Sequence, residues 1–247
     1  MSGQSEVIST NWPAPAHVRA LTTTRAGGVS NGPYESLNLG DHVGDEPEAV
    51  RHNRVRLREA LALPAEPLWL KQVHGVRVVD AATTAAGVEA DGAWSNRPGV
   101  VCAVLTADCL PIFFCDRKGT RVALLHAGWR GLAGGIIESG LRALNAPPEE
   151  LLVWLGPAIG PDSYEVGDDV RQTFTADDPG AAEAFRPVVA GRWLADVYAL
   201  ARRQLRQRGV CAVYGGTHCT LRERDRFYSY RRDGKTGRMA SLIWLAP

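Results

Sequence analysis

Short apolar runs bounded by glycine, proline or aspartate recur along the chain. Runs of this length that are rich in β-branched and apolar residues predict buried strands. The stretch 17–24 predicts a further strand that leads into a glycine-rich turn. The predicted strands are 17–24, 76–80, 100–105, 111–115, 121–127, 151–156, 210–216 and 241–246.

Three other segments repeat apolar residues at helical spacing. In 46–63, Pro47 occupies a first helical position, and Val50 and Leu57 fall on one face. Two more helices are predicted at 132–145 and 194–208, the latter followed by a glycine that stops a helix.

The order of these elements predicts the fold class. Strands and helices are interleaved without a strict βαβ rhythm, and several connections between strands are too short for a crossover helix. We therefore predict an α+β fold with mixed sheets. The polar stretch 175–192 is rich in alanine, glycine and proline and is interpreted as an exposed loop or short helix inside one domain.

Composition narrows the class of partner. The 247 residues carry 28 Lys+Arg against 27 Asp+Glu, a formal net charge of +1, so no overall field attracts nucleic acid or a membrane surface. The first residues lack the pattern of a signal peptide, and no run approaches the ~20 apolar residues of a membrane span. We expect a cytoplasmic protein with a small-molecule partner, without nucleic acid or membrane, and the sequence leaves its oligomeric state open.

Two histidines and a cysteine occupy the ends of predicted strands. His74 precedes a strand, His126 ends one, and Cys109 lies between two. Such a set makes a three-ligand zinc site with a fourth position free for water or substrate. Each imidazole taken singly is more often explained by a satisfied hydrogen bond than by a metal, and local zinc motifs are absent, so the spacing alone is weak evidence. The five cysteines, an odd number without a CxxC pair, indicate free thiols, ligands or a nucleophile.

Three more polar residues stand beside turns. Asp108 either orients a ligand or acts as an acid/base beside the metal, or it forms an Asx turn before the next strand. Arg25 stands beside Gly27 and Gly28, and Arg130 stands just before the predicted helix 132–145. Each arrangement suits an anion site, or simply a hairpin loop in the first case and a tight strand-to-helix turn in the second. Neither turn fits GxGxxG or a Walker loop, which argues against a dinucleotide fold.

Together the motifs resemble one family. The stretches TTTRAGGVS, SLNLGDHVGD, QVHG, ADG, TADCLPIFFCD, HAGWRGLAGG, GPAIGPDSYEVG and FYSYRRDGKTGRMASLIWL are similar to the YfiH-type or laccase-domain family, whose members are described as purine nucleoside phosphorylases. The resemblance runs from about residue 20 to the C-terminus. One departure is Asp162, which stands where many relatives carry cysteine.

The resemblance implies a fold and a metal site. It implies one laccase-type domain over 1–247 with layers in the order α/β/β/α, of which 1–16 is an N-terminal extension. It also implies zinc held by His74, Cys109 and His126.

The implied chemistry is phosphorolysis of adenosine, inosine, guanosine or methylthioadenosine to the free base and a (methylthio)ribose-1-phosphate. Adenosine deamination is also attributed to the family. Asp108 and Cys109 are the candidate catalytic residues. The candidate contacts to phosphate and nucleoside, each of which is equally explained as a structural or surface residue, are Arg25, Asn38, Lys71 and Arg231.

Three other functions compete with this one. A copper-dependent polyphenol oxidase fits the family's other label, and copper is expected to load in vitro, but six histidines are too few for a multicopper cluster. A cysteine hydrolase or amidase that edits peptidoglycan precursors would use Cys109 as nucleophile, with His126 or His74 as base. A binding module stabilised by metal is the third, and an open coordination position argues against it.

Overall fold

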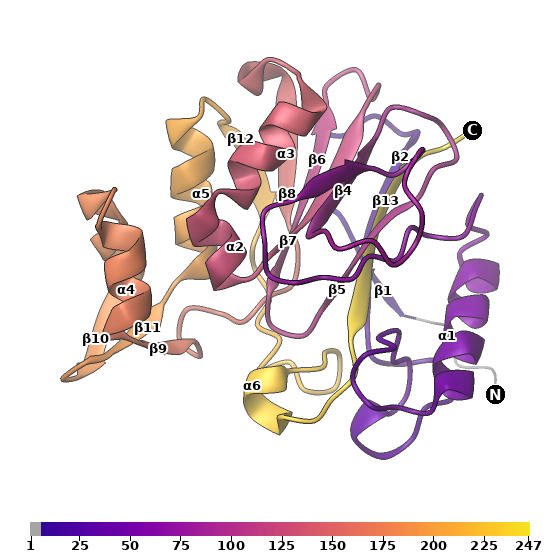
Figure 1. Ribbon diagram of the computed structural model, residues 1–247, viewed down its shortest axis with the longest axis horizontal. Coiled ribbons are helices and arrows are strands. Elements are labelled where there is room, and N and C mark those ends of the chain that lie inside the picture. The colour runs from indigo at the N-terminus through magenta and orange to yellow at the C-terminus, as the bar shows by residue number, and fades with distance from the viewer. Residues whose placement is uncertain (1–5) are drawn as a thin grey trace.

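Two β-sheets pack face to face, with helices on the outer face of each (Figure 1). The computed structural model describes residues 6–247. One sheet has six strands in the order β12-β8-β6-β7-β4-β3, and the other has four in the order β1-β2-β13-β5. The predicted α+β class and the α/β/β/α layering are confirmed.

The six-stranded sheet is mixed. The pairs β12–β8 and β3–β4 are parallel, while β8–β6, β6–β7 and β7–β4 are antiparallel. Its strands are β3 (Val78–Asp80), β4 (Gly92–Ser95), β6 (Leu110–Asp116), β7 (Val122–Ala127), β8 (Leu151–Leu155) and β12 (Ala212–Gly215). The central strands β6, β7 and β8 are buried along their whole length, as apolar strands covered on both faces must be.

The four-stranded sheet is antiparallel throughout. Its strands are β1 (Val7–Ser9), β2 (Val18–Thr23), β5 (Cys102–Thr106) and β13 (Met239–Leu245). Part of the stretch assigned to an N-terminal extension, 1–16, thus contributes an edge strand, while residues 1–5 lie outside the described residues. The division of the chain into extension and domain stays a prediction.

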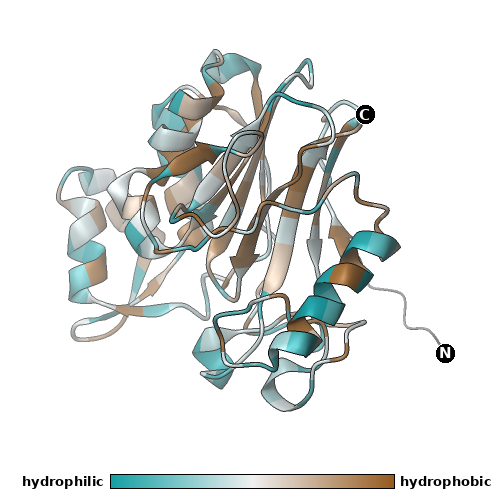
Figure 2. Cartoon of the chain, turned by 45° about the vertical axis from the view of Figure 1, so that its right-hand side comes forward, coloured by the Kyte–Doolittle hydropathy of each residue, from teal (hydrophilic) through white to brown (hydrophobic). Residues whose placement is uncertain are grey.

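Helices cover both sheets. The helices of residues 6–247 are α1 (Pro47–Ala60), α2 (Trp129–Gly134), α3 (Ile136–Leu144), α4 (Asp168–Thr175), α5 (Val197–Gln207) and α6 (Tyr230–Asp233), with short 3₁₀ turns η1 (Gly32–Tyr34), η2 (Pro148–Glu150) and η3 (Pro179–Ala184). Figure 2 shows α1 polar on its outer side with an apolar stripe. Within residues 6–247, no helix combines the length and the hydropathy needed to cross a bilayer.

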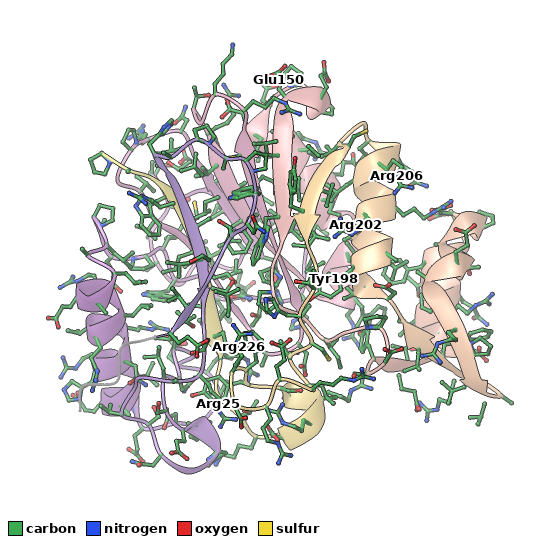
Figure 3. The ribbon with its side chains drawn as sticks, turned by 180° about the vertical axis from the view of Figure 1, so that it is seen from behind. Arg25, Glu150, Tyr198, Arg202, Arg206 and Arg226 are labelled. Atoms are coloured by element: carbon green, nitrogen blue, oxygen red, sulfur yellow. The ribbon has the colours of Figure 1, made fainter. Side chains whose placement is uncertain are left out.

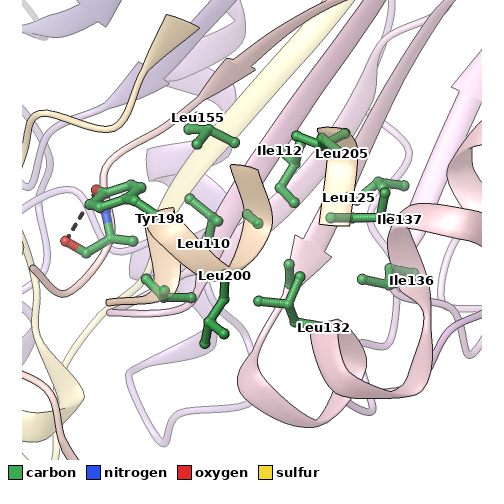
Figure 4. Packing of buried hydrophobic residues seen from close by; sticks show 14 of the residues in the cluster. Leu110, Ile112, Leu125, Leu132, Ile136, Ile137, Leu155, Tyr198, Leu200 and Leu205 are labelled. Carbon is green, nitrogen blue, oxygen red and sulfur yellow. Dashed lines mark hydrogen bonds between the residues drawn. The ribbon is translucent and has the colours of Figure 1, made fainter. Parts of the chain in front are cut away.

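Three apolar clusters hold the layers together. One lies between the six-stranded sheet and helices α2, α3 and α5, where Leu110, Ile112 and Leu125 meet Leu132 and Leu205 (Figure 4). A second lies between the two sheets, and a third lies between the four-stranded sheet and α1. Burial of apolar surface at all three interfaces supplies the main driving force for this arrangement.

Two predicted segments are corrected by the structure. The helix expected at 132–145 is two helices, α2 and α3, because Gly135 between them has a φ of +97°. The stretch 175–192, expected as a loop or short helix, contains η3 and the strand β10 (Phe185–Val189). With β9 (Glu165–Gly167) and β11 (Arg192–Ala195) it forms a three-stranded sheet that projects from the body beside α4 (Figure 1).

Candidate metal centre

The three predicted metal ligands converge at one end of the six-stranded sheet. Ligand atoms of His74, Cys109 and His126 all lie within 4.8 Å of one another. The Cys109 Sγ is 3.8 Å from the His74 Nε2, and the two imidazole rings meet edge to face with centroids 4.8 Å apart. Among residues 6–247 this is the one group of three or more such side chains arranged to hold a metal ion.

Strand pairing brings these residues together. His126 is the penultimate residue of β7 and pairs with Pro111 of β6. This pairing places the turn before β6, and hence Cys109, beside the end of β7. Gly128 follows β7 at this point, and a Cβ there would stand 2.6 Å from the His74 Cδ2 and 3.3 Å from the Cys109 Sγ. Only a glycine at this position leaves room for His74 and Cys109.

Asp91 holds the two histidines in place, and sequence reasoning missed it. Its fully buried carboxylate accepts a hydrogen bond from the His126 Nδ1 at 2.8 Å. It also accepts from the backbone amides of Val73, His74 and Gly75, at 3.2, 2.9 and 2.7 Å. These bonds fix the loop in which His74 has a φ of +60°. A carboxylate on Nδ1 leaves Nε2 of His126 for a metal.

Without a metal, the cluster pairs a thiolate with a protonated imidazole, and a metal ion would displace the imidazole proton. Burial alone would raise the pKa of the Cys109 thiol, but the adjacent His126 and His74 outweigh it and lower this pKa to about 6. Burial would likewise lower the pKa of His126, but the Cys109 thiolate and Asp91 raise it to about 9. The thiolate is the form of cysteine that binds metals. Two imidazoles, a thiolate and a carboxylate behind one imidazole therefore fit a zinc ion.

Asp108 adjoins the cluster but binds distant segments. Its φ is +92°, and its carboxylate accepts hydrogen bonds from the Thr220 hydroxyl at 2.6 Å, the Ser229 hydroxyl at 3.0 Å and the Arg231 backbone amide at 2.7 Å. These partners lie more than a hundred residues away, unlike the local backbone contacts of an Asx turn. Asp108 thereby fixes the segment before and within α6 against the metal ligands.

A cavity of about 240 Å³ opens onto the cluster. Two arginines line it, each over an aromatic ring. The Arg130 guanidinium lies 4.5 Å from the centroid of Trp129, and that of Arg231 lies 5.3 Å from the centroid of Tyr164. Other lining residues are His74, Asp108, Cys109, Ile159, Val197 and Tyr230. The cavity thus joins the metal ligands, aromatic surface and positive charge.

Of the four candidate substrate contacts, Arg231 lines this cavity and the other three do not. Arg25 packs its guanidinium over the Tyr228 ring and donates to the Glu35 carbonyl oxygen at 2.9 Å. Figure 3 shows Arg25 beside Arg226, and the Arg226 carbonyl oxygen accepts a hydrogen bond from the Arg25 backbone amide.

The remaining two candidates are also engaged elsewhere. Asn38 is fully buried, and its side chain forms hydrogen bonds with Gly40 and Asp45. Lys71 is exposed and pairs with Glu89 at 2.8 Å. The role of these residues in binding stays a prediction, and the geometry favours Arg231.

Known proteins resemble this chain over almost its whole length. A sequence profile of the family described as multi-copper polyphenol oxidoreductase laccase matches residues 19–246. A Pseudomonas aeruginosa relative named purine nucleoside phosphorylase is 56% identical over 96% of this chain and 98% of its own. The Escherichia coli relative YfiH, with the same enzyme name, is 52% identical over 98% and 99%. A Neisseria meningitidis crystal structure superposes with a TM-score of 0.94 at 55% identity, over 98% and 99%.

Proposed function

The chain belongs to the family described as multi-copper polyphenol oxidoreductase laccase, and from this premise and the site we propose that it is a zinc-dependent purine nucleoside phosphorylase. One observation carries the proposal: the His74, Cys109 and His126 cluster opens into a cavity that also contains two arginines. The enzyme name of the relatives supports the same activity.

His74, Cys109 and His126 would hold the zinc ion, with Asp91 orienting His126. Three protein ligands and one open position are typical of catalytic rather than structural zinc. When bound, zinc would supply Lewis acidity toward a polar atom of the substrate. Copper binds nitrogen and sulfur ligands more tightly than zinc does, so copper is expected to load at the same ligands in vitro.

The cavity supplies the other groups that phosphorolysis needs. Cleavage of a glycosidic bond passes through an oxocarbenium-like sugar, so the site must hold an anionic phosphate beside the sugar and support the departing base. Arg130 and Arg231 are the phosphate anchors in this proposal, and Trp129 offers an aromatic face to the purine. Asp108 positions Arg231 through its backbone amide. The expected substrates are adenosine, inosine, guanosine and methylthioadenosine.

A cysteine hydrolase is the second candidate, and a specific contact favours it. Without metal, Cys109, His126 and Asp91 have the order of a nucleophile, a base and an orienting carboxylate, and the pKa of Cys109 is lowered to about 6. Such an enzyme would cleave an amide bond, for example in a peptidoglycan precursor. It would be active without metal and would lose activity on alkylation, whereas the phosphorylase requires the metal.

A multicopper oxidase is not supported by the available ligands. Electron transfer to dioxygen in such enzymes needs further imidazoles for a trinuclear centre. In the described chain His17 contacts the Gly119 carbonyl oxygen and His218 pairs with Glu223, both away from the cluster. His42 and His52 are exposed. Residues 6–247 contain a single cluster of three such ligands.

Product analysis tests the proposal. Purified protein loaded with one equivalent of zinc is incubated with adenosine, inosine, guanosine or methylthioadenosine, with and without phosphate. The proposal predicts free base and the sugar 1-phosphate only when phosphate is present. Inosine formed from adenosine would instead indicate the deaminase activity attributed to the family. No base release from any of the four nucleosides would refute the assignment.

A further inference from the structure

The hydroxyl of Tyr164 has no hydrogen-bond partner among residues 6–247, although its residue lines the cavity. The three buried tyrosines of the described chain all donate: Tyr34 to the Val43 carbonyl oxygen, Tyr228 to that of Tyr34, and Tyr198 to that of Gly156. Buried tyrosine hydroxyls normally find a partner. Tyr164 is in contrast only partly buried, and its hydroxyl is free to bond a ligand that enters the cavity.

The Tyr164 ring is held firmly. It packs against the apolar cluster beneath α2 and α5, the Arg231 guanidinium lies over it, and its carbonyl oxygen accepts from the Ala195 amide at 2.9 Å. Burial first, and then the negative charge of Cys109, raise the pKa of its hydroxyl to about 12. The hydroxyl therefore keeps its proton at physiological pH, and Tyr164 lines the same cavity as His74 and Cys109.

Other polar groups of the cavity are less suited to give up a proton. The Asp108 carboxylate accepts three hydrogen bonds, and the two histidines and Cys109 are assigned to the metal. Arginine side chains do not release protons in proteins. Tyr230 is 61% exposed and its ring lies at the solvent side. A purine leaves a sugar more easily when its imidazole ring is protonated, so a donor at this position would assist the reaction.

We propose that the Tyr164 hydroxyl donates a proton to the departing purine, an inference that rests on the phosphorolysis proposed above. The bond between the anomeric carbon and the base breaks, its electron pair stays on the base, and the base takes the Tyr164 proton. A phosphate oxygen forms the new bond to the anomeric carbon. The proton that hydrogenphosphate thereby loses returns to the phenolate, so the products are the neutral base and the sugar 1-phosphate.

Comparison of two substrates tests this role. Inosine needs a proton on its base, whereas the base of 7-methylinosine already carries a positive charge and leaves without one. In the zinc-loaded Tyr164→Phe protein, kcat for inosine is expected to fall by about 10²–10⁴-fold, the usual range for loss of a general acid. The kcat for 7-methylinosine should stay within about threefold of the wild type, because phenylalanine keeps the ring beneath Arg231.

Controls separate the possible causes of a change. The variant Tyr214→Phe removes a hydroxyl from β12, outside the cavity, and should leave both rates unchanged. Zinc content and melting temperature report whether Tyr164→Phe is folded and loaded. Equal losses with both substrates would mean that Tyr164 only positions groups, and no loss with inosine would mean that it is not needed; either result overturns the inference. A wild type inactive on both nucleosides would instead refute the phosphorylase itself.

Discussion

At the scale of single residues, the Asp91 carboxylate receives four hydrogen bonds, three from backbone amides of the His74 loop and one from His126. A buried carboxylate that is satisfied in this way stays ionised. Burial alone would raise its pKa, yet the hydrogen bonds from His126 and Gly75 bring it below the usual value. The same group thus orients one ligand and fixes the backbone of another.

Asp91→Asn is expected to weaken zinc binding by about 10–100-fold, the usual effect of losing an outer carboxylate on a metal-bound histidine. The amide keeps the size of the side chain but loses the charge that favours the His126 tautomer with a free Nε2. Competition with a chromogenic chelator measures the affinity. Glu89→Gln, which alters an exposed carboxylate two residues away, should bind zinc like the wild type. Unchanged affinity in Asp91→Asn would contradict this role.

The sequence allowed the ligands to be predicted but not Asp91. His74, Cys109 and His126 are polar residues at the ends of apolar strands, and the family resemblance selected them. Asp91 lies 17 residues from His74 and 35 from His126, so no local spacing links them. Its one signal was the ADG motif, in which the glycine opens β4.

At the scale of elements, α2 begins with Trp129 and Arg130 in the wall of the cavity and ends at the break before α3. Leu132 before the break and Ile136 after it both enter the same apolar cluster, so the apolar spacing continues across Gly135. Apolar spacing alone therefore predicted one helix. The hairpin β10–β11 was missed for another reason: residues 186–189 are all exposed although two of them are valines, so polar and apolar residues do not alternate along this strand.

Gly135→Ala should destabilise the protein by about 1–2 kcal/mol, the cost of the left-handed conformation for a residue with a Cβ. The Cβ itself has room, since the nearest atom is the Glu138 Oε2 at 3.9 Å. Asparagine tolerates this conformation better, so Gly135→Asn should cost less than Gly135→Ala. Urea unfolding gives both free energies, and equal stability of wild type and Gly135→Ala would show that the backbone conformation is not what breaks the helix.

An ion pair joins η3 to α5 and makes their contact sensitive to acid. The Arg203 guanidinium donates to both oxygens of Asp178, with one contact at 2.6 Å, and lowers the pKa of Asp178 to about 2. The pKa of Asp178 in the folded protein lies below its ordinary value. The ion pair therefore stabilises the fold at pH values above the ordinary pKa, and this stabilisation is lost as the pH falls toward 2.

The difference in unfolding free energy between wild type and Asp178→Asn should therefore be constant from neutral pH to about pH 4 and shrink below it. Urea unfolding at a series of pH values measures the difference. Glu183→Gln, which changes a neighbouring exposed carboxylate of η3, serves as the control and should show a smaller pH dependence. A difference that does not change down to the lowest pH at which the protein folds would exclude this ion pair as the cause.

At the scale of the whole molecule, the site forms where segments far apart in the chain meet. The turn from β5 to β6 links the two sheets and contains Asp108 and Cys109. The end of β7, the His74 loop and the segment that leads into α6 surround this turn. The α+β class could be predicted from the interleaved strands and helices and their short connections, whereas the order of the layers came from the family resemblance. The order of strands in each sheet could not be predicted, since the local pattern does not determine which strands pair.

Zinc titration of the apoprotein with turnover as the readout tests the central claim most directly. Base release from inosine in the presence of phosphate is measured as zinc is added in increments to the wild type and to Cys109→Ser. We predict that wild-type turnover rises linearly and reaches a plateau at one zinc per chain, while the variant neither binds zinc tightly nor turns over. Full turnover by the metal-free wild type, or a Cys109→Ser protein as active as the wild type, would contradict the account.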